Sequence, residues 1–424
     1  MKPKKINNSQ GRLFEQRLSE LLNPAHEFYM LAEMIDWDYY EKEFGSFYSE
    51  NNSREPKPIR LMVGLVMLQN MFNLSDKFVV RSWLENPYWQ FFCGFDFLQW
   101  KFPIDPSSLT RFRQRLGEKG IQKIFKSTIK IALEEGFVSE KSLEKVIVDT
   151  TVMEKNISHP TDAKLYHRAR ERLVKWCEKE NITLRQKYTH VSKKTLHEVS
   201  RYAHARQMKR AKSKTKQLKG LLGRVYRDAL RKGKDLGVNL INQPIFTLID
   251  SILYQDRTSA KKIYSFHEPH VCCISKGKAH KKYEFGCKVS VTVTHKDGLA
   301  LEVSALEGNP YDGHTLKDAL ARAEENSESK IKIAFTDKGY RGHSVTDKIV
   351  YRSGQKRGVT KSIKKMLKRR QAIEPQIGHM KQEGKLARSF LKGFLGDKLN
   401  AILCGVGHNL RFIFRKLSEI PVLA

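Results

Sequence analysis

Long hydrophobic runs, closely spaced cysteines and acidic residues are all scarce in this chain of 424 residues. The longest uncharged apolar stretch near the N-terminus, residues 61–68, is far too short to span a bilayer. The N-terminus carries positive charge without the apolar segment of a secretory signal, so we expect neither a membrane protein nor an exported one. Six cysteines are scattered without framework spacing, which is typical of reduced thiols in the cytoplasm.

Motifs for two further chemistries are also missing. No phosphate-binding loop of the form G-x-x-x-x-G-K-[ST] occurs, so use of a nucleoside triphosphate is unsupported. A group of histidines and cysteines invites a zinc interpretation, but its spacing matches no closed zinc motif, which disfavours that site. The group consists of His267, His270, Cys272, Cys273, His280 and Cys287.

What the chain has in excess is positive charge. It holds 78 Lys and Arg against 46 Asp and Glu, for a net charge of +32, while 40% of its residues are hydrophobic and 10% aromatic. The apolar content is enough for two or three domains with proper cores. The excess of positive charge is informative about binding partners rather than about the fold. Nucleic acid is the polyanion that proteins with such an excess most often bind.

The basic residues are concentrated between residues 161 and 240. That segment contains 23 Lys and Arg against 7 Asp and Glu, a surplus of 16. Leu165, Ala169, Leu173 and Cys177 repeat every four residues, which predicts that the segment begins as an amphipathic helix. A solvated face is the simple explanation of a charge run, but this length favours a surface that follows phosphates. We predict DNA contacts at Lys209, Arg210 and Lys212.

Residues 57–140 have a helical pattern with one arginine-rich helix. Asp105 and Pro106 predict an N-cap followed by proline at the first helical position. In the helix that follows, the spacing turns Arg111, Arg113 and Arg115 mostly outward. A compact helical domain with an exposed arginine helix resembles a DNA-reading helix-turn-helix, although a solvated charged face explains the spacing equally well.

Two aspartates follow short β-branched runs. Residues 146–148 lead into Asp149, and residues 331–335 lead to Asp337. Runs of this kind are typical of buried strands, so both carboxylates are expected at the end of a sheet.

A third acid, Glu374, lies in a basic segment. Arg370, Glu374, Ile377 and Lys381 recur at spacings of four, three and four, which places them on one helical face. Pro375 disfavours helical geometry at the residue before it, so we expect the helix to start there or to be kinked. Glu374 has a simpler interpretation as the partner of Arg370 one turn away, just as a strand-terminal aspartate is often only a turn residue.

The order of the expected elements indicates the fold class. Omitting the basic segment, the chain runs strand, hairpin, helix, strand, strand, helix. This is the order of a ribonuclease H-like α/β core, with acids on the first strand, on the strand after the helix and on the last helix. The expected elements are 146–153, 283–293 with 299–305, 313–325, 331–336, 348–351 and the helix around Glu374.

Three carboxylates in this setting suit metal-assisted phosphodiester chemistry. Two divalent cations about 3.5–4 Å apart can activate a water and stabilise a leaving oxygen. Mg²⁺ prefers carboxylate, water and phosphate oxygens. Two such ions carry a charge of about +4, which balances three carboxylates and one phosphate. We therefore expect two Mg²⁺ ions, or Mn²⁺ in their place, at Asp149, Asp337 and Glu374.

Longer motifs around these residues resemble the bacterial IS5-type transposases of the IS4/IS5 superfamily. The resemblance covers about residues 55 to 415 and includes the helical region before the core. The motifs are VDTTVMEKNISHPTDAKLYHRAR, SFHEPHVCCISKGKAHKKYEFGCKVSV, GNPYDGHTL, TDKGYRGH and IEPQIGHMKQEGKLARSFLKG.

This resemblance implies a catalytic DDE triad, which falls on Asp149, Asp337 and Glu374. It also implies the signature Y-x2-R-x3-E-x6-K around the glutamate. Arg370 and Lys381 match that signature as phosphate contacts, whereas Leu367 stands at the tyrosine position. Further DNA contacts are expected at Tyr340, Arg341, Arg111 and Arg115.

The resulting hypothesis is a transposase that binds the inverted repeats of an insertion sequence and catalyses DNA cleavage and strand transfer. Its partners are double-stranded DNA and a second copy of the chain, and its place is the bacterial cytoplasm at the nucleoid. A non-catalytic DNA-binding derivative and a stand-alone nuclease are the alternatives. The expected domains are a polar segment 1–56, a helical domain 57–140, a catalytic core 141–160 with 241–400, a basic helical insertion 161–240 and a C-terminal helix 401–424.

Overall fold

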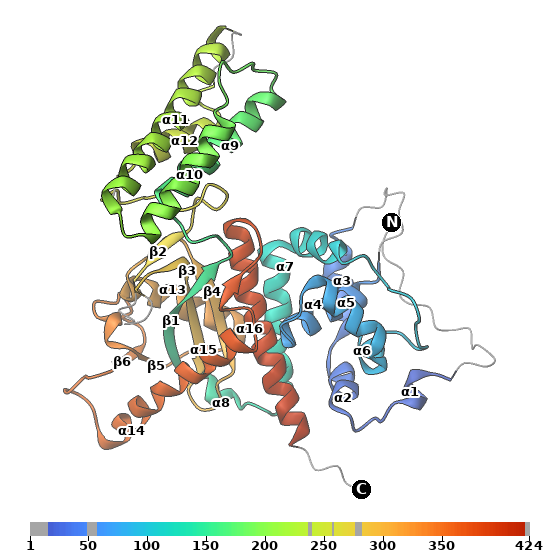
Figure 1. Ribbon diagram of the computed structural model, residues 1–424. Helices are drawn as coiled ribbons and strands as arrows, with labels where there is room; N and C mark the ends of the chain where they lie inside the picture. Colours follow the sequence, from blue (N-terminus) through green and yellow to red (C-terminus); the bar gives the residue numbers. More distant parts are fainter. Residues whose placement is uncertain (1–15, 49–56, 236–239, 257, 276–281, 420–424) are drawn as a thin grey trace. The chain divides into compact units, whose positions relative to one another are not determined.

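The chain divides into two compact units in the computed structural model, which is drawn in Figure 1. Unit 1 comprises residues 1–154 and 287–424, and unit 2 comprises residues 155–286. Unit 2 is thus an insertion that interrupts unit 1 directly after its first strand. The structure describes residues 16–48, 57–235, 240–256, 258–275 and 282–419.

Three helices occur where the sequence analysis expects only a polar segment. They are α1 (Leu18–Leu21), α2 (Glu27–Met34) and α3 (Trp37–Gly45). Short polar stretches separate the helices, but each helix turns a few large apolar side chains inward. Leu31, Tyr40 and Phe44 are fully buried in the main core of unit 1. The first part of the chain therefore belongs to the folded unit.

The rest of the N-terminal region is helical, as expected. It contains α4 (Ile59–Met71), α5 (Asp76–Glu85), α6 (Pro87–Phe92), α7 (Ser107–Glu134) and the short α8 (Glu140–Leu143). The Asp105 carboxylate accepts a hydrogen bond from the Ser107 backbone N–H at 2.9 Å, which agrees with the predicted helix start. Gly117 interrupts α7 with φ of 58°, a left-handed conformation that glycine adopts without steric cost.

A mixed sheet forms the centre of unit 1. Its strands are β1 (Lys145–Lys155), β3 (Glu284–Thr294), β4 (Ala300–Leu306), β5 (Ile333–Thr336), β6 (Ile349–Arg352) and the short β7 (Arg388–Ser389). β3 lies next to β1, β1 lies next to β5 and β5 lies next to β6, while β4 pairs with β3 and β7 pairs with β1. β1 pairs with β5 and β5 pairs with β6 in parallel, whereas β3 and β4 form the expected antiparallel hairpin.

Helices cover both faces of this sheet. Glu302 on β4 contacts Arg322 of α13 (Asp312–Ser327), with 3.3 Å between carboxylate and guanidinium. The next residue, Val303, lies against Gly405 of α16 (Gly393–Ser418), where a Cβ would come within 3.1 Å of the valine. Because successive residues of a strand point to opposite faces, α13 and α16 lie on opposite sides of β4. This layering agrees with the predicted α/β class.

Unit 2 is a helical bundle with its own apolar core. It contains α9 (Asp162–Lys179), α10 (Thr189–His204), α11 (Met208–Asp235) and α12 (Pro244–Tyr254), followed by the short strand β2 (Cys272–Ile274). Leu165, Ala169, Leu173 and Cys177 are all buried, so the predicted amphipathic face is confirmed.

The boundary of the insertion differs from the expected 161–240. Phe246 and Ile249 of α12 are fully buried in the core of unit 2, so residues 241–286, expected in the catalytic core, belong to unit 2. Every helix in the described ranges is too short or too polar to traverse a bilayer.

Candidate active site

The two aspartates are brought together by the register of two parallel strands. Val148 on β1 and Thr336 on β5 are paired across the sheet. Asp149 and Asp337 are the next residues along these two chains. Since parallel strands run in the same direction, the two aspartates lie beside each other at the point where β5 ends, while β1 continues to Lys155. The structure thus brings the two acids together, but only Asp337 follows the end of its strand, whereas Asp149 lies within β1.

Backbone groups hold each aspartate. The Asp149 carboxylate accepts a hydrogen bond of 2.7 Å from the backbone N–H of Thr150, and the Asp149 side chain is 23% exposed. Asp337 precedes a single 3₁₀ turn, η1 (Lys338–Tyr340), and its carbonyl accepts a hydrogen bond of 3.3 Å from the Tyr340 backbone N–H. Both carboxylates therefore sit on backbone that has little freedom to move.

Tyr340, expected at the DNA surface, lies instead inside this site. The side chain is 1% exposed, and the hydroxyl has no hydrogen-bond partner in the described structure. Burial, followed by the nearby carboxylates of Asp149, Asp312, Glu302 and Asp337, raises the pKa of the Tyr340 hydroxyl well above its ordinary value. The hydroxyl is therefore protonated.

Glu374 reaches the site from a broken helix. α14 (Lys361–Arg369) ends in a 3₁₀ turn, η2 (Arg370–Ala372), and α15 (Ile373–Gln382) begins two residues before Pro375. The proline lies in the first turn of α15, where a missing N–H leaves no hydrogen bond unmade. The Glu374 side chain is 66% exposed, in contrast to the half-buried aspartates.

Arg370 connects the helix to the sheet. Its guanidinium lies 3.8 Å from the Asp149 carboxylate and 3.7 Å from the Glu374 carboxylate, and the Arg370 side chain is only 9% exposed. The buried Arg370 Nε has no hydrogen-bond partner in the described structure. One guanidinium thus bridges the first and third predicted acids. The predicted pairing of Arg370 with Glu374 is present, and the same guanidinium also contacts Asp149 on β1.

Nearby cations differ in their surroundings. Lys381 is half-buried on α15 and makes contacts of its own, whereas Arg341 is exposed after η1. Leu367, at the signature tyrosine position, packs against the main core. Arg369 donates hydrogen bonds to the carbonyls of His295 at 3.0 Å and Lys296 at 2.5 Å, which anchors the end of α14 to the β3–β4 turn.

A stripe of lysines on α14 extends from this anchor. Lys361, Lys364, Lys365 and Lys368 are all exposed and recur at helical spacing on one face. Within the described residues, none of the four forms an ion pair, and α14 contains no acidic residue. The sequence analysis missed this stripe. The run KSIKKMLKR immediately before Arg370 was the signal that could have revealed it.

The predicted arginine helix of the N-terminal region is only partly exposed. Arg111 and Arg115 are exposed, and Arg115 lies over the ring of Tyr48 at 4.5 Å. Arg113, which the spacing turns outward, is instead 4% exposed and forms an ion pair of 2.6 Å with Asp76 on α5. The expectation for Arg113 was wrong because a partner 37 residues away draws its guanidinium inward.

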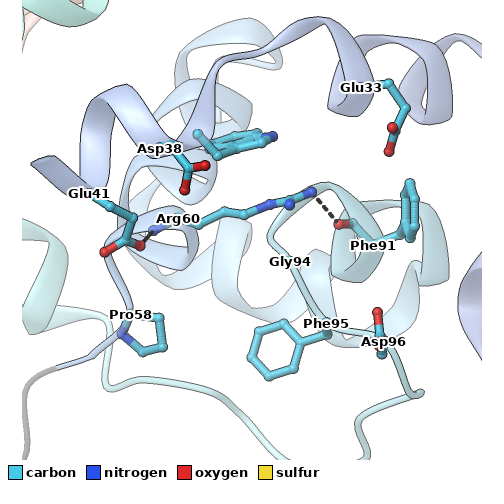
Figure 2. Close-up of a pocket in the computed structure, with 10 residues that line it drawn as sticks. Glu33, Asp38, Glu41, Pro58, Arg60, Phe91, Gly94, Phe95 and Asp96 are labelled. Carbon is cyan, nitrogen blue, oxygen red and sulfur yellow. Dashed lines mark hydrogen bonds between the residues drawn. The ribbon is translucent and has the colours of Figure 1, made fainter. Parts of the chain in front are cut away.

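A pocket in the same region is rich in acids (Figure 2). Arg60 crosses its centre, lies over the Trp37 ring at 4.7 Å and donates to the carbonyls of Phe91 and Phe92, each at 3.2 Å. The Arg60 guanidinium thus binds backbone carbonyl groups. The surrounding carboxylates belong to Glu33, Asp38, Glu41 and Asp96. Such a lining repels phosphate, so this pocket does not suit a contact with DNA.

The basic surface predicted for the insertion lies on unit 2. Lys209, Arg210 and Lys212 are exposed on α11. Lys214 is different, because its ammonium pairs with the Glu198 carboxylate at 2.6 Å.

The donor set at the strand ends fits hard divalent cations. Within the described residues, no three His, Cys, Asp or Glu side chains converge tightly enough to hold a metal as they stand. However, Asp149 and Asp337 supply adjacent carboxylates, Glu374 is exposed enough to change rotamer, and the partnerless Tyr340 hydroxyl lies among them. Carboxylates are the ligands that Mg²⁺ prefers, so these residues fit the implied ions.

Known protein families match two parts of the chain. Residues 16–115 match the Transposase domain (DUF772), and residues 256–410 match the Transposase DDE domain. The second match contains Asp337 and Glu374 but begins after Asp149, so the first acid rests on the strand register. His280 of the disfavoured zinc group lies outside the described residues.

A relative matches about half of this chain. The uncharacterized protein ORF8 in nfe locus of Rhizobium meliloti is 44% identical to this chain over 207 residues, which are 49% of this chain and all of the relative. No solved structure matches the chain. Two transposase domains in succession, together with the paired aspartates on β1 and directly after β5, place the chain among known proteins: it belongs to the DDE transposase family.

Proposed function

We propose that this protein is the DNA transposase of a bacterial insertion sequence of the IS5 type. It binds the terminal inverted repeats and catalyses DNA cleavage at the element ends, followed by strand transfer. The observation that carries the proposal is the parallel pairing of Val148 with Thr336, which sets Asp149 and Asp337 side by side. The match of the surrounding residues to a transposase DDE domain supports the same reaction.

Asp149, Asp337 and Glu374 are proposed as the metal ligands. Two divalent cations, Mg²⁺ or Mn²⁺, would supply an activated water and stabilise the leaving oxygen. The aspartates form the fixed side of this site, and Glu374 completes it when its carboxylate leaves Arg370. That exchange is favoured by DNA, because a scissile phosphate offers the guanidinium a new anionic partner.

Arg370 is then the residue that links DNA to the acids. Its planar guanidinium can accept a phosphate in a bidentate contact after the carboxylates turn to metal. Lys381 and Arg341 are proposed as additional phosphate contacts near the scissile bond. The exposed lysines of α14 extend the same cationic path away from Glu374.

Strand transfer requires no further chemical group. A 3′-hydroxyl released by the first cleavage attacks a phosphodiester of the target, forming one bond to phosphorus as another breaks. Two element ends must be joined to one target, so we propose a homodimer acting on double-stranded DNA in the bacterial cytoplasm. Arg111, Arg115 and the α11 cations Lys209, Arg210 and Lys212 are proposed to bind DNA away from the reacting phosphate.

Incubation of the protein with a duplex that carries the element end tests this function. With Mg²⁺ present, we expect strand breaks at the element boundary that leave a 3′-hydroxyl, and products in which that end is joined to target DNA. Breaks without joined products would instead identify a nuclease. Binding without breaks, under conditions where the protein is folded, would identify a DNA-binding derivative that has lost catalysis.

A further inference from the structure

A fourth carboxylate, Asp312, is built into the same site. It is the first residue of α13, in the motif GNPYDGHTL, to which the sequence analysis gives no role. One Asp312 oxygen accepts hydrogen bonds from the Thr150 hydroxyl at 2.9 Å and from the Lys288 ammonium at 3.1 Å. Lys288 also donates to the carbonyl of Pro310 at 2.6 Å. Asp312 therefore joins β1, β3 and the start of α13.

This arrangement connects directly to Asp149. The Thr150 backbone N–H donates to the Asp149 carboxylate at 2.7 Å, while the hydroxyl of the same threonine donates to Asp312. A continuous hydrogen-bonded path thus runs from the Lys288 ammonium through Asp312 and Thr150 to Asp149. Such a path fixes the rotamer and the orientation of the carboxylate at its end.

The start of α13 also supports the loop that follows Asp337. A Cβ at Gly339 would lie 3.2 Å from the second Asp312 oxygen, so the loop approaches this carboxylate closely. The Tyr311 hydroxyl donates to the carbonyl of Arg341 at 2.9 Å. The segment around Asp312 is therefore packed against both aspartate-bearing elements.

We propose that Asp312 and Lys288 are a positioning pair for metal binding by Asp149 and Asp337. This inference rests on the proposed function, since it assigns the pair to the same site. We assign Asp312 a positioning role rather than a ligand role, because Thr150 and Lys288 both donate to one of its oxygens. Lys288 offsets the charge of Asp312, which would otherwise add a fourth negative charge beside the aspartates.

The positive charge of Lys288 is balanced by the carboxylate of Asp312. The Lys288 side chain is 10% exposed, and its ammonium has a carboxylate partner only in Asp312 among the described residues. If Asp312 loses its charge, a buried cation remains close to the metal site and opposes the binding of Mg²⁺. If Lys288 loses its charge as well, the repulsion disappears, although the hydrogen-bonded path stays incomplete.

Binding of Mn²⁺ to the protein in complex with an element-end duplex that cannot be cleaved, measured by titration calorimetry, tests the pair without any cleavage. We expect Asp312→Asn and Thr150→Val each to weaken Mn²⁺ binding about tenfold or more, as the loss of groups that orient metal ligands commonly does. Lys288→Met in the Asp312→Asn background should recover part of that loss. The matched controls are Asp318→Asn and Lys317→Met, which change exposed residues of the same helix.

The Mg²⁺ concentration for half-maximal cleavage should rise with the loss of Mn²⁺ affinity, while DNA affinity stays near that of the wild type; the melting temperature of each variant shows that it is folded at the assay temperature. Unchanged Mn²⁺ affinity in Asp312→Asn and Thr150→Val would overturn the proposal. Complete loss of metal binding in Asp312→Asn, with Thr150→Val unaffected, would overturn it in favour of Asp312 as a direct ligand. Wild-type protein that binds Mn²⁺ but breaks no DNA would refute the proposed function and leave the pair standing.

Discussion

Two sides of the candidate site are held in different ways. On the sheet side, Asp149 and Asp337 follow paired residues of parallel strands, and backbone hydrogen bonds fix both. On the helix side, Glu374 is 66% exposed and is held by a guanidinium 3.7 Å away. The sheet therefore sets where the metal site is, and the helix supplies a ligand that can move. A site of this design can stay incomplete until DNA arrives.

Arg370 is the residue whose partners are expected to differ between the DNA-free and the DNA-bound protein. In the DNA-free protein its guanidinium contacts both Asp149 and Glu374 and offsets part of their negative charge. Three neighbouring carboxylates without such a cation would repel one another, since screening is weak at partly buried positions. A phosphate that attracts Arg370 would free both acids at once, so DNA binding and completion of the metal site are coupled.

The largest effect is expected from removing the acids themselves. Asp149→Ala, Asp337→Ala and Glu374→Ala should each lower the cleavage rate by about a thousandfold or more, because metal ligands contribute several factors of ten to the rate. DNA affinity should stay within about threefold, since it comes from the cationic surfaces. Cleavage of labelled element ends and a parallel binding titration measure both. A mutant that cuts at the wild-type rate would remove its residue from the triad.

A smaller effect should distinguish the roles of Arg370 and Glu374 on the helix side of the site. Arg370→Lys keeps the charge but loses the planar fork, so we expect cleavage to fall about tenfold with little change in the Mg²⁺ concentration for half-maximal rate. Glu374→Gln should raise that concentration about tenfold or more. Cleavage rates measured across a Mg²⁺ titration distinguish the two variants. If Arg370→Lys shifts the Mg²⁺ dependence as far as Glu374→Gln does, Arg370 serves mainly to position the glutamate.

The sheet side was largely predictable from the sequence, and the reason is local. The β-branched runs before Asp149 and Asp337 have the pattern of buried strands, and β1 and β5 are found there. Parallel pairing then follows from the order of the elements. Hydrophobic periodicity depends on neighbours in the chain, so it can be recognised without knowledge of the tertiary structure.

Polar contacts on both sides were not predictable in the same way. The ion pair of Arg113 with Asp76, the burial of Tyr340 and the bridge from Arg370 to Asp149 all join distant parts of the chain. Helical spacing gives the direction of a side chain relative to its own helix, but it does not give the partner. The same limit concealed Asp312, whose three neighbours come from different elements.

The α14 lysines offer a further test of the helix side. Lys364→Gln combined with Lys368→Gln should reduce cleavage of bound element ends about tenfold, because these cations adjoin the segment that carries Glu374. The slope of log K against log salt should also fall by up to about 2, since each lost phosphate contact contributes about 0.9. Lys119→Gln with Lys317→Gln, two exposed lysines elsewhere in unit 1, is the matched control. Equal behaviour of both double variants would show that α14 is only a solvated face.

Unit 2 should show the smallest effect on catalysis, because its basic surface lies on an insertion that contains none of the three acids. Neutralising Lys209, Arg210, Lys212 and Lys216 on α11 should flatten the salt dependence by about 2 to 4 in slope, since each neutralised phosphate releases counterions. Cleavage at saturating DNA should stay unchanged. Affinity measured between low and physiological salt, together with single-turnover cleavage, separates the two quantities.

Lys214 provides the control for that experiment. Its ammonium already pairs with the Glu198 carboxylate at 2.6 Å, so it has little charge to offer a phosphate. Replacing both partners by glutamine keeps the net charge and should leave the slope as it is in the wild type. If neutralising the four α11 cations also leaves the slope unchanged, unit 2 does not follow the DNA backbone. Its surplus of positive charge then faces solvent or a protein. If their loss lowers cleavage at saturating DNA, the insertion takes part in arranging the reacting DNA, and the separation between a catalytic unit and a binding unit is wrong.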